Sequence, residues 1–341
     1  MRIAFVSTDL ARLDPGSGAL ERAVIAWARG LRARGHEVSL LDAGPLGAST
    51  AALGSLGCDL TVLNNRPCWG GGIEAPTAVL QVLHNYEDAW SSRPVRPGAY
   101  EAALCRPESA VMAVSPSLAR HVEATFATAG PVAVATVPIE QCFLAARWAG
   151  RGGPVLFPNR LLEKKGVRFF LELARRLAGR GLSCRLFAHT APFDPPTSEQ
   201  QELLSLAAAS PHVELLAPPS SREEMAAAYA AAGAVCCPSV RPEGLGLVAL
   251  EAQAVGAPLV TSGLGGLSDA TFPPNEVVAG FHLDDWEAAV LRALQRGGSD
   301  QAAAAVAARH SEERATASIE LAAERLDGTG GRRSAARSRR V

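Results

Sequence analysis

The sequence predicts an α/β fold of two doubly wound parallel-sheet domains that face each other across a cleft. Short apolar runs alternate with helix-like segments along most of the chain, as expected for parallel strands connected by helices. The length of 341 residues and the hydrophobic fraction of 48% suit two cores better than one. A stretch rich in glycine and proline, 138–154, interrupts the alternation and predicts a linker.

The first predicted domain, 1–137, opens with a strand, a loop and a helix. Residues 3–6 form an apolar run, and four apolar residues at helical spacing between 20 and 31 make one stripe. Gly35 is expected to end this helix in the left-handed conformation. A later helix is expected to begin at Ser115 or Ser117. Further strands are expected at 37–41, 58–63, 78–83, 110–114 and 132–137.

The second predicted domain, 138–310, repeats the alternation. Helices are expected at 166–178, from Ser221, from about Gly246 and from Asp284, and Ser221 with Glu224 resembles a capping box. A helix at 311–326 is expected to pack back on the first domain. Strands are expected at 155–158, 184–188, 213–216, 234–238, 258–261 and 277–281.

The composition excludes several classes of protein. The net charge is −1, which indicates no attraction to nucleic acid, and no apolar run reaches the length of a membrane span. The first ten residues do not form a signal peptide, and the seven cysteines include no CxxC pair. These features predict a cytoplasmic protein with reduced thiols and no metal site, and they leave the oligomeric state open.

The C-terminal segment 327–341 has a different composition, with five arginines between 332 and 340. We expect a disordered, solvated tail. Weak peripheral association with an anionic membrane surface is the alternative, because clustered arginines are attracted to acidic lipids.

Two carboxylates separated by seven residues form the clearest chemical signal. Glu243 and Glu251 follow a predicted strand, and two glycines lie where the loop between them enters a helix. Such glycines let N–H groups approach a ligand, and a helix N-terminus favours anions such as a diphosphate. A glycosidase pair would need carboxyl groups roughly 5 to 9.5 Å apart, whereas eight helical residues span about 12 Å. The spacing therefore favours two contacts along one extended ligand, with ordinary positions on a loop and a helix as the alternative.

Two cations flank the turn between the strand at 155–158 and the helix at 166–178. Arg160 offers five guanidinium donors and Lys165 an ammonium group, a combination suited to a pyrophosphate. A solvated basic turn without a ligand is the alternative interpretation.

In combination, these signals resemble the retaining glycosyltransferases of family 4, which have the two-domain GT-B fold. The family's Gly-Arg-Leu-x-x-x-Lys-Gly appears as residues 159–166, with Asn159 in place of the first glycine. Its Pro-Ser, Glu-x7-Glu and Ala-x-Ala-x-Gly-x-Pro appear within 238–258, followed by Gly-Gly at 265–266. At the N-terminus, Gly-Gly-x-Glu-Arg and Arg-Gly-His-Glu-Val are matched by 18–22 and 34–38. The resemblance covers residues 1 to about 326.

The resemblance implies a role for each residue of the second domain's motifs. Arg160 and Lys165 would hold the diphosphate of a nucleotide-activated sugar. Glu243 would bind hydroxyls of the donor sugar, and Glu251 would bind the nucleotide ribose. Glu243 would be assisted by the backbone amides of Gly244, Leu245 and Gly246.

The first domain would complete the site. Gly18 and Ala19 would approach the diphosphate, and His84, at the end of a predicted strand, would face the donor sugar. A buried structural histidine is the alternative for His84. In the segment 64–76, Asn64, Asn65, Trp69 and the glycines 70–72 could line the acceptor pocket, and a plain flexible loop is the favoured alternative. The acceptor pocket is the least transferable part of the resemblance.

The implied reaction is retaining transfer of a hexose-type sugar from a nucleotide-diphosphate sugar, UDP- or GDP-linked, to an unidentified hydroxyl acceptor. Arginine and lysine would replace a metal, so neither a metal nor a further cofactor is expected. A non-catalytic nucleotide-sugar-binding protein and a nucleotide-sugar epimerase are the alternatives. Three departures from the family pattern separate this chain from it: Ala19 in place of a glycine, residues 187–193 without glycines, and a linker without Asn-Gly.

Overall fold

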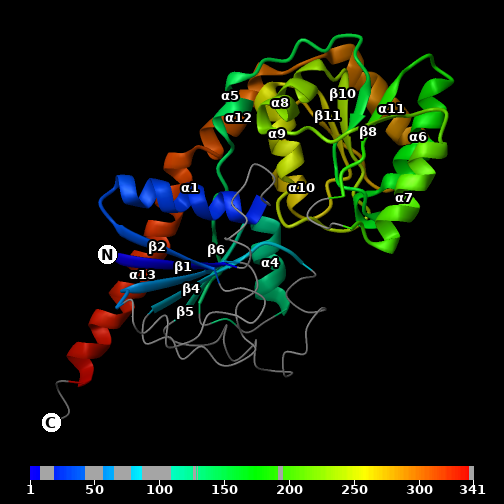
Figure 1. Ribbon diagram of the computed structural model, residues 1–341. Coiled ribbons are helices and arrows are strands. Elements are labelled where there is room, and N and C mark those ends of the chain that lie inside the picture. The colour runs from blue at the N-terminus through cyan, green and yellow to red at the C-terminus, as the bar shows by residue number, and fades with distance from the viewer. Residues whose placement is uncertain are drawn as a thin grey trace. The chain divides into compact units, whose positions relative to one another are not determined.

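The computed structural model describes residues 1–7, 19–42, 57–64, 78–86, 109–125, 128, 130–190 and 195–337, without the side chains of 19, 20, 42 and 327–337. The chain divides into two compact units. Unit 1 comprises Met1–Pro138 and His310–Val341, and unit 2 comprises Ile139–Arg309. Each unit contains a six-stranded parallel sheet with helices packed on it (Figure 1), which confirms the predicted α/β class.

The sheet of unit 1 is parallel throughout. Its strands are β1 (Arg2–Ser7), β2 (Glu37–Asp42), β3 (Leu60–Asn64), β4 (Ala78–Leu83), β5 (Ser109–Ala113) and β6 (Ala133–Val134). The order is β2-β1-β3-β4-β5-β6, so the direction of winding reverses between β1 and β3. Ligands of such sheets bind outside the carboxyl ends of the strands at this reversal.

Three helices of unit 1 are described: α1 (Ala19–Ala33), α4 (Pro116–Thr125) and α13 (Glu312–Arg337). The apolar stripe of α1 is buried, since Val24, Trp27 and Leu31 are each 0% exposed. Gly35, at φ 85°, follows the helix in the expected left-handed conformation. Ser115 begins α4, because its Oγ accepts from the N–H of Leu118 at 3.2 Å.

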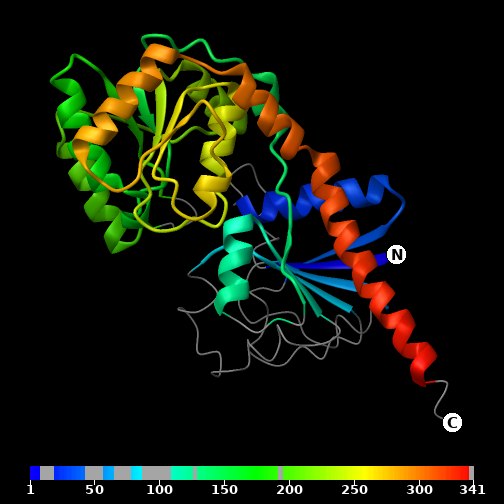
Figure 2. The ribbon, with the colours of Figure 1, turned by 180° about the vertical axis from the view of Figure 1, so that it is seen from behind.

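Helix α13 packs along α1, as Figure 2 shows from behind. Arg29 Nε donates to Glu312 at 2.7 Å, and Glu320 is paired with both Arg34 and His36. The backbone of α13 extends to Arg337, whereas the sequence predicts a disordered tail from 327 onward. The disorder of the tail stays a prediction. The side chains of the tail lie outside the described residues, and its membrane association stays a prediction.

Close packing of α1 on α13 depends on the missing side chain of Gly30. A Cβ atom at this position would overlap Oγ1 of Thr316. We therefore expect Gly30→Ala to lower the free energy of unfolding by about 2 kcal/mol, since overpacking typically costs 1–3 kcal/mol. Urea unfolding would measure the loss. The double variant Gly30→Ala/Thr316→Ala is expected to recover part of it, and no recovery would contradict this explanation.

Unit 2 also has a parallel sheet. Its strands are β7 (Val155–Phe157), β8 (Cys184–Phe187), β9 (Glu214–Leu216), β10 (Ala234–Cys237), β11 (Leu259–Thr261) and β12 (Glu276–Val277). The order is β12-β11-β10-β7-β8-β9, so the winding reverses between β7 and β10. This reversal is the expected ligand-binding position of unit 2.

The helices of unit 2 form two layers around this sheet. They are α5 (Gln141–Ala145), the 3-10 helix η3 (Glu163–Lys165), α6 (Val167–Ala178), α7 (Ser198–Ala209), α8 (Arg222–Ala231), α9 (Leu247–Val255), α10 (Gly266–Asp269), α11 (Leu283–Arg296) and α12 (Asp300–Arg309). Helices α6, α7 and α11 pack together on one side, and α5, α8, α9 and α12 pack together on the other (Figure 1). The predicted linker therefore contains a short helix, α5, and packs within unit 2.

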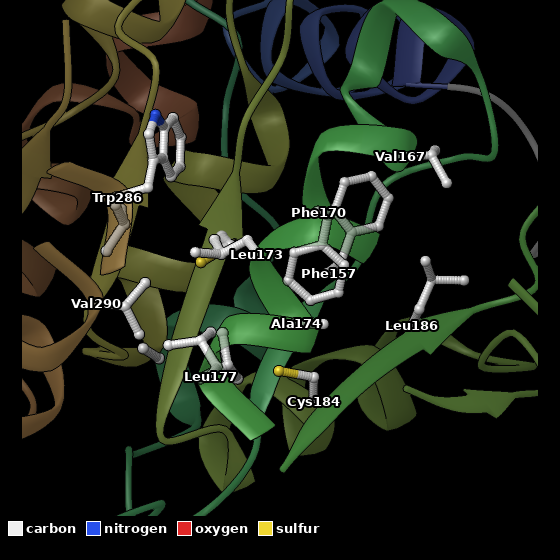
Figure 3. Close-up of a cluster of buried hydrophobic side chains, with 14 of the residues drawn as sticks. Phe157, Val167, Phe170, Leu173, Ala174, Leu177, Cys184, Leu186, Trp286 and Val290 are labelled. Atoms are coloured by element: carbon white, nitrogen blue, oxygen red, sulfur yellow. The ribbon is translucent and has the colours of Figure 1, made fainter. Parts of the chain in front are cut away.

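The core between β7, α6 and α11 fixes the position of the turn that follows β7. Phe157 from β7 stacks at a tilt on Phe170 from α6, with ring centroids 5.0 Å apart. Trp286 from α11 is fully buried in the same cluster (Figure 3). Among the described helices, none is both long and apolar enough to cross a membrane.

Candidate functional site

Two loops meet at the reversal point of the unit 2 sheet. One follows β7 and contains Arg160 and Lys165, and the other follows β10 and contains Glu243. The N–H of Val240 donates to the carbonyl of Lys164 at 3.0 Å, which joins the two loops. The fold thus brings the two sequence motifs to the same edge of the sheet, where a ligand is expected.

Lys165 and Glu243 form a largely buried ion pair between these loops. The Nζ of Lys165 lies 2.7 Å from Oε2 of Glu243, and the two side chains are 15% and 14% exposed. Ser239 donates from its Oγ to the other carboxylate oxygen. Burial raises the pKa of Glu243. The charge of Lys165 and these hydrogen bonds lower it by more than burial raises it, so the pKa falls below its ordinary value. Glu243 is therefore ionised at neutral pH.

This ion pair leaves hydrogen-bonding capacity for a ligand on both partners. An ammonium group has three donors, and Lys165 uses one on Glu243. A carboxylate has about four lone-pair sites, and two of them are occupied by Lys165 and Ser239. The arrangement suits a ligand with an anionic group beside hydroxyl groups.

The N-terminus of α9 lies directly after Glu243. Gly246 precedes this nine-residue helix at φ 89° and gives it no side-chain cap. Within the described part of the chain, the N–H groups of Gly244, Leu245 and Gly246 have no acceptor. Free amides at a helix N-terminus attract anions. The loop at Gly265 is paired with Glu243 through an isolated parallel bridge, which fixes the backbone here.

Glu251 lies on α9 and is 5% exposed. Arg222 donates from Nη2 to its Oε1, and the hydroxyl of Tyr229 donates to its Oε2 at 3.2 Å. Cys237 is the last residue of β10, and its thiol interacts electrostatically with both Glu243 and Glu251. Burial, followed by the charge of Glu243, raises the pKa of Cys237 to about 12, so this thiol is neutral and is no nucleophile.

Arg160 lies in the loop after β7, on the same edge of the sheet as Lys165. Its carbonyl accepts from the N–H of Leu162 at 2.9 Å, so its backbone belongs to the tight turn before η3. Asn159, in the position where the family pattern has glycine, is 3% exposed.

In unit 1, three polar side chains gather at the carboxyl ends of β1, β3 and β4. Asn64 donates from Nδ2 to Ser7 Oγ at 3.2 Å, and His84 Nε2 lies 2.7 Å from Asn64 Oδ1. Because an amide oxygen only accepts, Nε2 carries the ring proton. Burial lowers the pKa of His84 to about 3. The ring is therefore neutral at physiological pH.

Some predicted site residues lie at or beyond the limits of the described chain. Gly18 and the acceptor-pocket candidates at 65–76 lie outside the described residues. Ala19 is the first residue of α1, and its side chain is not described. The roles assigned to these residues stay predictions.

Sequence reasoning missed Arg222 and Tyr229, which bind Glu251 from α8. Arg222 is adjacent to Ser221, which does cap α8, since its Oγ accepts from the N–H of Glu224 at 3.1 Å. The Glu224 carboxylate accepts from the N–H of Ser220 at 2.8 Å. The backbone of Ser221 also contributes to lowering the pKa of Glu224. No local sequence pattern connects α8 to Glu251.

One other place is of interest as a binding site. A surface cavity of about 310 Å³ lies beside α11 and is lined by Val277, Val278, Ala279, Asp285, Ala288 and Arg292. Its one cation, Arg292, already pairs with Glu276 at 2.9 Å. Within the described ranges, no three His, Cys, Asp or Glu residues are placed to hold a metal ion. The reversal point of unit 2 remains the stronger candidate.

Comparison with known families agrees with this location. Residues 153–296 match the family model described as Glycosyl transferases group 1. This matched segment covers most of unit 2. The matched segment contains both loops, the ion pair and Glu251. No curated protein matches the chain in sequence.

Solved structures match nearly the whole chain in fold. The sucrose-phosphate synthase of Thermosynechococcus elongatus aligns with a TM-score of 0.76 and 19% identity, over 96% of this chain and 99% of that one. Anabaena HepE in complex with UDP-glucose aligns with a TM-score of 0.73 and 15% identity, over 96% and 100%. A glycosyltransferase from Rickettsia africae aligns with a TM-score of 0.74 and 14% identity, over 95% and 98%. The chain has the GT-B fold of two α/β units.

Proposed function

We propose that the protein is a retaining glycosyltransferase of family 4 that transfers a hexose-type sugar from a UDP- or GDP-linked donor to a hydroxyl acceptor. The ion pair between Lys165 and Glu243 beside the free amides of α9 carries this proposal, because it combines cationic, anionic and N–H groups. The group 1 family match over the same loops supports it. So do the similar structures of HepE, which were solved with UDP and with UDP-glucose.

In the proposed reaction, the departing nucleoside diphosphate develops negative charge. Lys165, Arg160 and the N–H groups of residues 244–246 would stabilise this charge, as preorganised donors do in other transfer reactions. Glu243 would hold the sugar hydroxyls through its unoccupied lone pairs, and Glu251 would accept from the ribose. We propose retention by attack of the acceptor on the face that the diphosphate leaves, with the phosphate taking the acceptor's proton.

We further propose that these cations make a divalent metal unnecessary. His84 in unit 1, neutral and hydrogen-bonded to Asn64, would contribute a hydrogen bond to the sugar and no proton. Transfer should then be insensitive to EDTA, and it should show no ionisation of His84 between about pH 5 and 8.

The test is product analysis with a panel of UDP- and GDP-linked sugars and simple hydroxyl acceptors. We expect release of the nucleoside diphosphate and a glycoside whose anomeric configuration, read by NMR, equals that of the donor. An inverted anomer would contradict retention. Donor binding without any release would instead indicate the non-catalytic alternative, and a donor converted to its epimer would indicate an epimerase.

A further inference from the structure

A buried polar network surrounds Glu251 and joins three elements of unit 2. Arg222 and Tyr229 come from α8, and Glu251 comes from α9. Glu140 and Phe143 come from the segment that opens unit 2, Glu140 just before α5 and Phe143 within it. The proposed ribose contact is thus surrounded by residues that no motif includes.

The guanidinium of Arg222 is held on two edges and one face. Its Nη2 donates to Glu251, and its Nε donates to Glu140 at 3.1 Å. Its Cζ atom lies 4.7 Å from the ring centroid of Phe143, so the guanidinium covers the ring. Burial lowers the pKa of Arg222, but the carboxylates of Glu251 and Glu140 raise it more, so the net shift is upward. Arg222 therefore stays charged and keeps one orientation.

The carboxylate of Glu251 is in turn held on both oxygens. Arg222 occupies Oε1 and the Tyr229 hydroxyl occupies Oε2. Tyr229 is 0% exposed and its ring lies 5.9 Å from that of Phe143, so this donor is also fixed. Each carboxylate oxygen retains a lone pair, and their directions are set by the two donors.

We propose that Arg222 is a positioning residue for the nucleotide: it keeps the Glu251 carboxylate oriented to accept from the ribose hydroxyls. This inference rests on the proposed function, in which Glu251 binds the ribose. The Glu251 side chain is 6% exposed, and Arg222 is the cation that pairs with it. Glu140 and Phe143 contact Arg222 independently of Glu251. The position of the guanidinium therefore does not depend on Glu251, and the guanidinium can orient the carboxylate.

The test compares two ligands that differ only in the ribose hydroxyls. UDP and 2′,3′-dideoxyuridine diphosphate are titrated calorimetrically into the whole chain, or the matching guanosine pair if GDP is the tighter ligand. The wild-type protein is expected to bind UDP about 30-fold more tightly, since hydrogen bonds to a charged acceptor are among the stronger ones. Arg222→Met is expected to reduce this preference to about threefold or less, with the affinity for the dideoxy ligand unchanged.

Two further variants keep the test decisive. Arg176→Met is the matched control, because Arg176 also pairs with a buried carboxylate, Glu287, at 3.0 Å on another side of unit 2. It should retain the full preference for UDP. Arg222→Lys retains the charge but cannot contact Glu251 and Glu140 through two edges of a guanidinium. Its preference for UDP over the dideoxy ligand should fall several-fold. This variant replaces Arg222→Met in the test if Arg222→Met does not fold.

The outcomes distinguish failure of the ribose contact from failure of the positioning role. If the wild type does not distinguish the two ligands, the ribose contact of Glu251 fails and the role of Arg222 falls with it. If the wild type and both Arg222 variants distinguish them equally, only the positioning role is overturned. Equal weakening of both ligands in the Arg222 variants would also overturn it, because that result indicates a general structural role.

Discussion

Replacing Lys165 by methionine is expected to weaken binding of UDP or GDP about 10- to 100-fold, since a charge-assisted hydrogen bond contributes roughly 1.5–3 kcal/mol. Donor turnover should fall about 10²- to 10³-fold, the usual cost of removing one preorganised donor from a developing anion. The variant also leaves Glu243, whose side chain is 14% exposed, without its cation. Calorimetric titration and the rate of nucleoside diphosphate release would measure the two effects.

Arg168→Met is the matched control for this variant. Arg168 is a cation on α6, close in sequence to Lys165, but its side chain is 45% exposed and pairs with Glu163 and Glu202 on the surface. Surface pairs contribute little, so this variant should bind and turn over the donor like the wild type. Equal losses in the two variants would show that the effect of Lys165 is general electrostatics rather than a direct contact.

Replacing Gly166 by alanine is expected to lower the free energy of unfolding by about 3 kcal/mol, because a strained backbone and a steric overlap add. Gly166 has φ 79°, and its missing Cβ makes room for the carbonyl oxygen of Pro238. Pro238 begins the loop that carries Glu243, so the variant should also separate the two halves of the site. Urea unfolding and nucleotide titration would measure the two losses.

Gly181→Ala isolates the backbone component of this effect. Gly181 has φ 75°, but nothing lies within 4 Å of the position where its Cβ would be. It should cost about 1 kcal/mol and leave nucleotide affinity unchanged. If the two alanine variants are equally stable, the contact between Gly166 and Pro238 does not hold the loops together.

The sequence predicted those elements whose apolar pattern is long and local. Buried runs located β1 and β4, and the stripe containing Trp27 located α1. The edge strands were less predictable: β6 and β12 are each two residues long, because apolar residues at a sheet edge need not pair along their whole length. Helix α7 was missed although Thr197 and Gln200 form a reciprocal capping box at its start. Helix α12 was missed because its alanine-rich sequence has only a weak apolar stripe.

The site was predictable where it depends on motifs and unpredictable where it depends on packing. Glycine spacing and the two carboxylates identified the loop and helix around Glu243. The contact between Lys165 and Glu243 joins positions far apart in the chain, so only the fold shows that the two motifs share one ion pair. Arg222 and Glu251 lie on different helices, and the surrounding sequence of Arg222 resembles an ordinary helix start.

Hydrogen exchange of the wild-type chain with and without UDP or GDP tests the central claim most directly, namely that the donor binds at the reversal point between β7 and β10. Bound nucleotide is expected to slow amide exchange in 159–167 and 239–251, above all at the free N–H groups of residues 244–246. Protection confined to the cavity beside α11, at 277–292, would contradict this account.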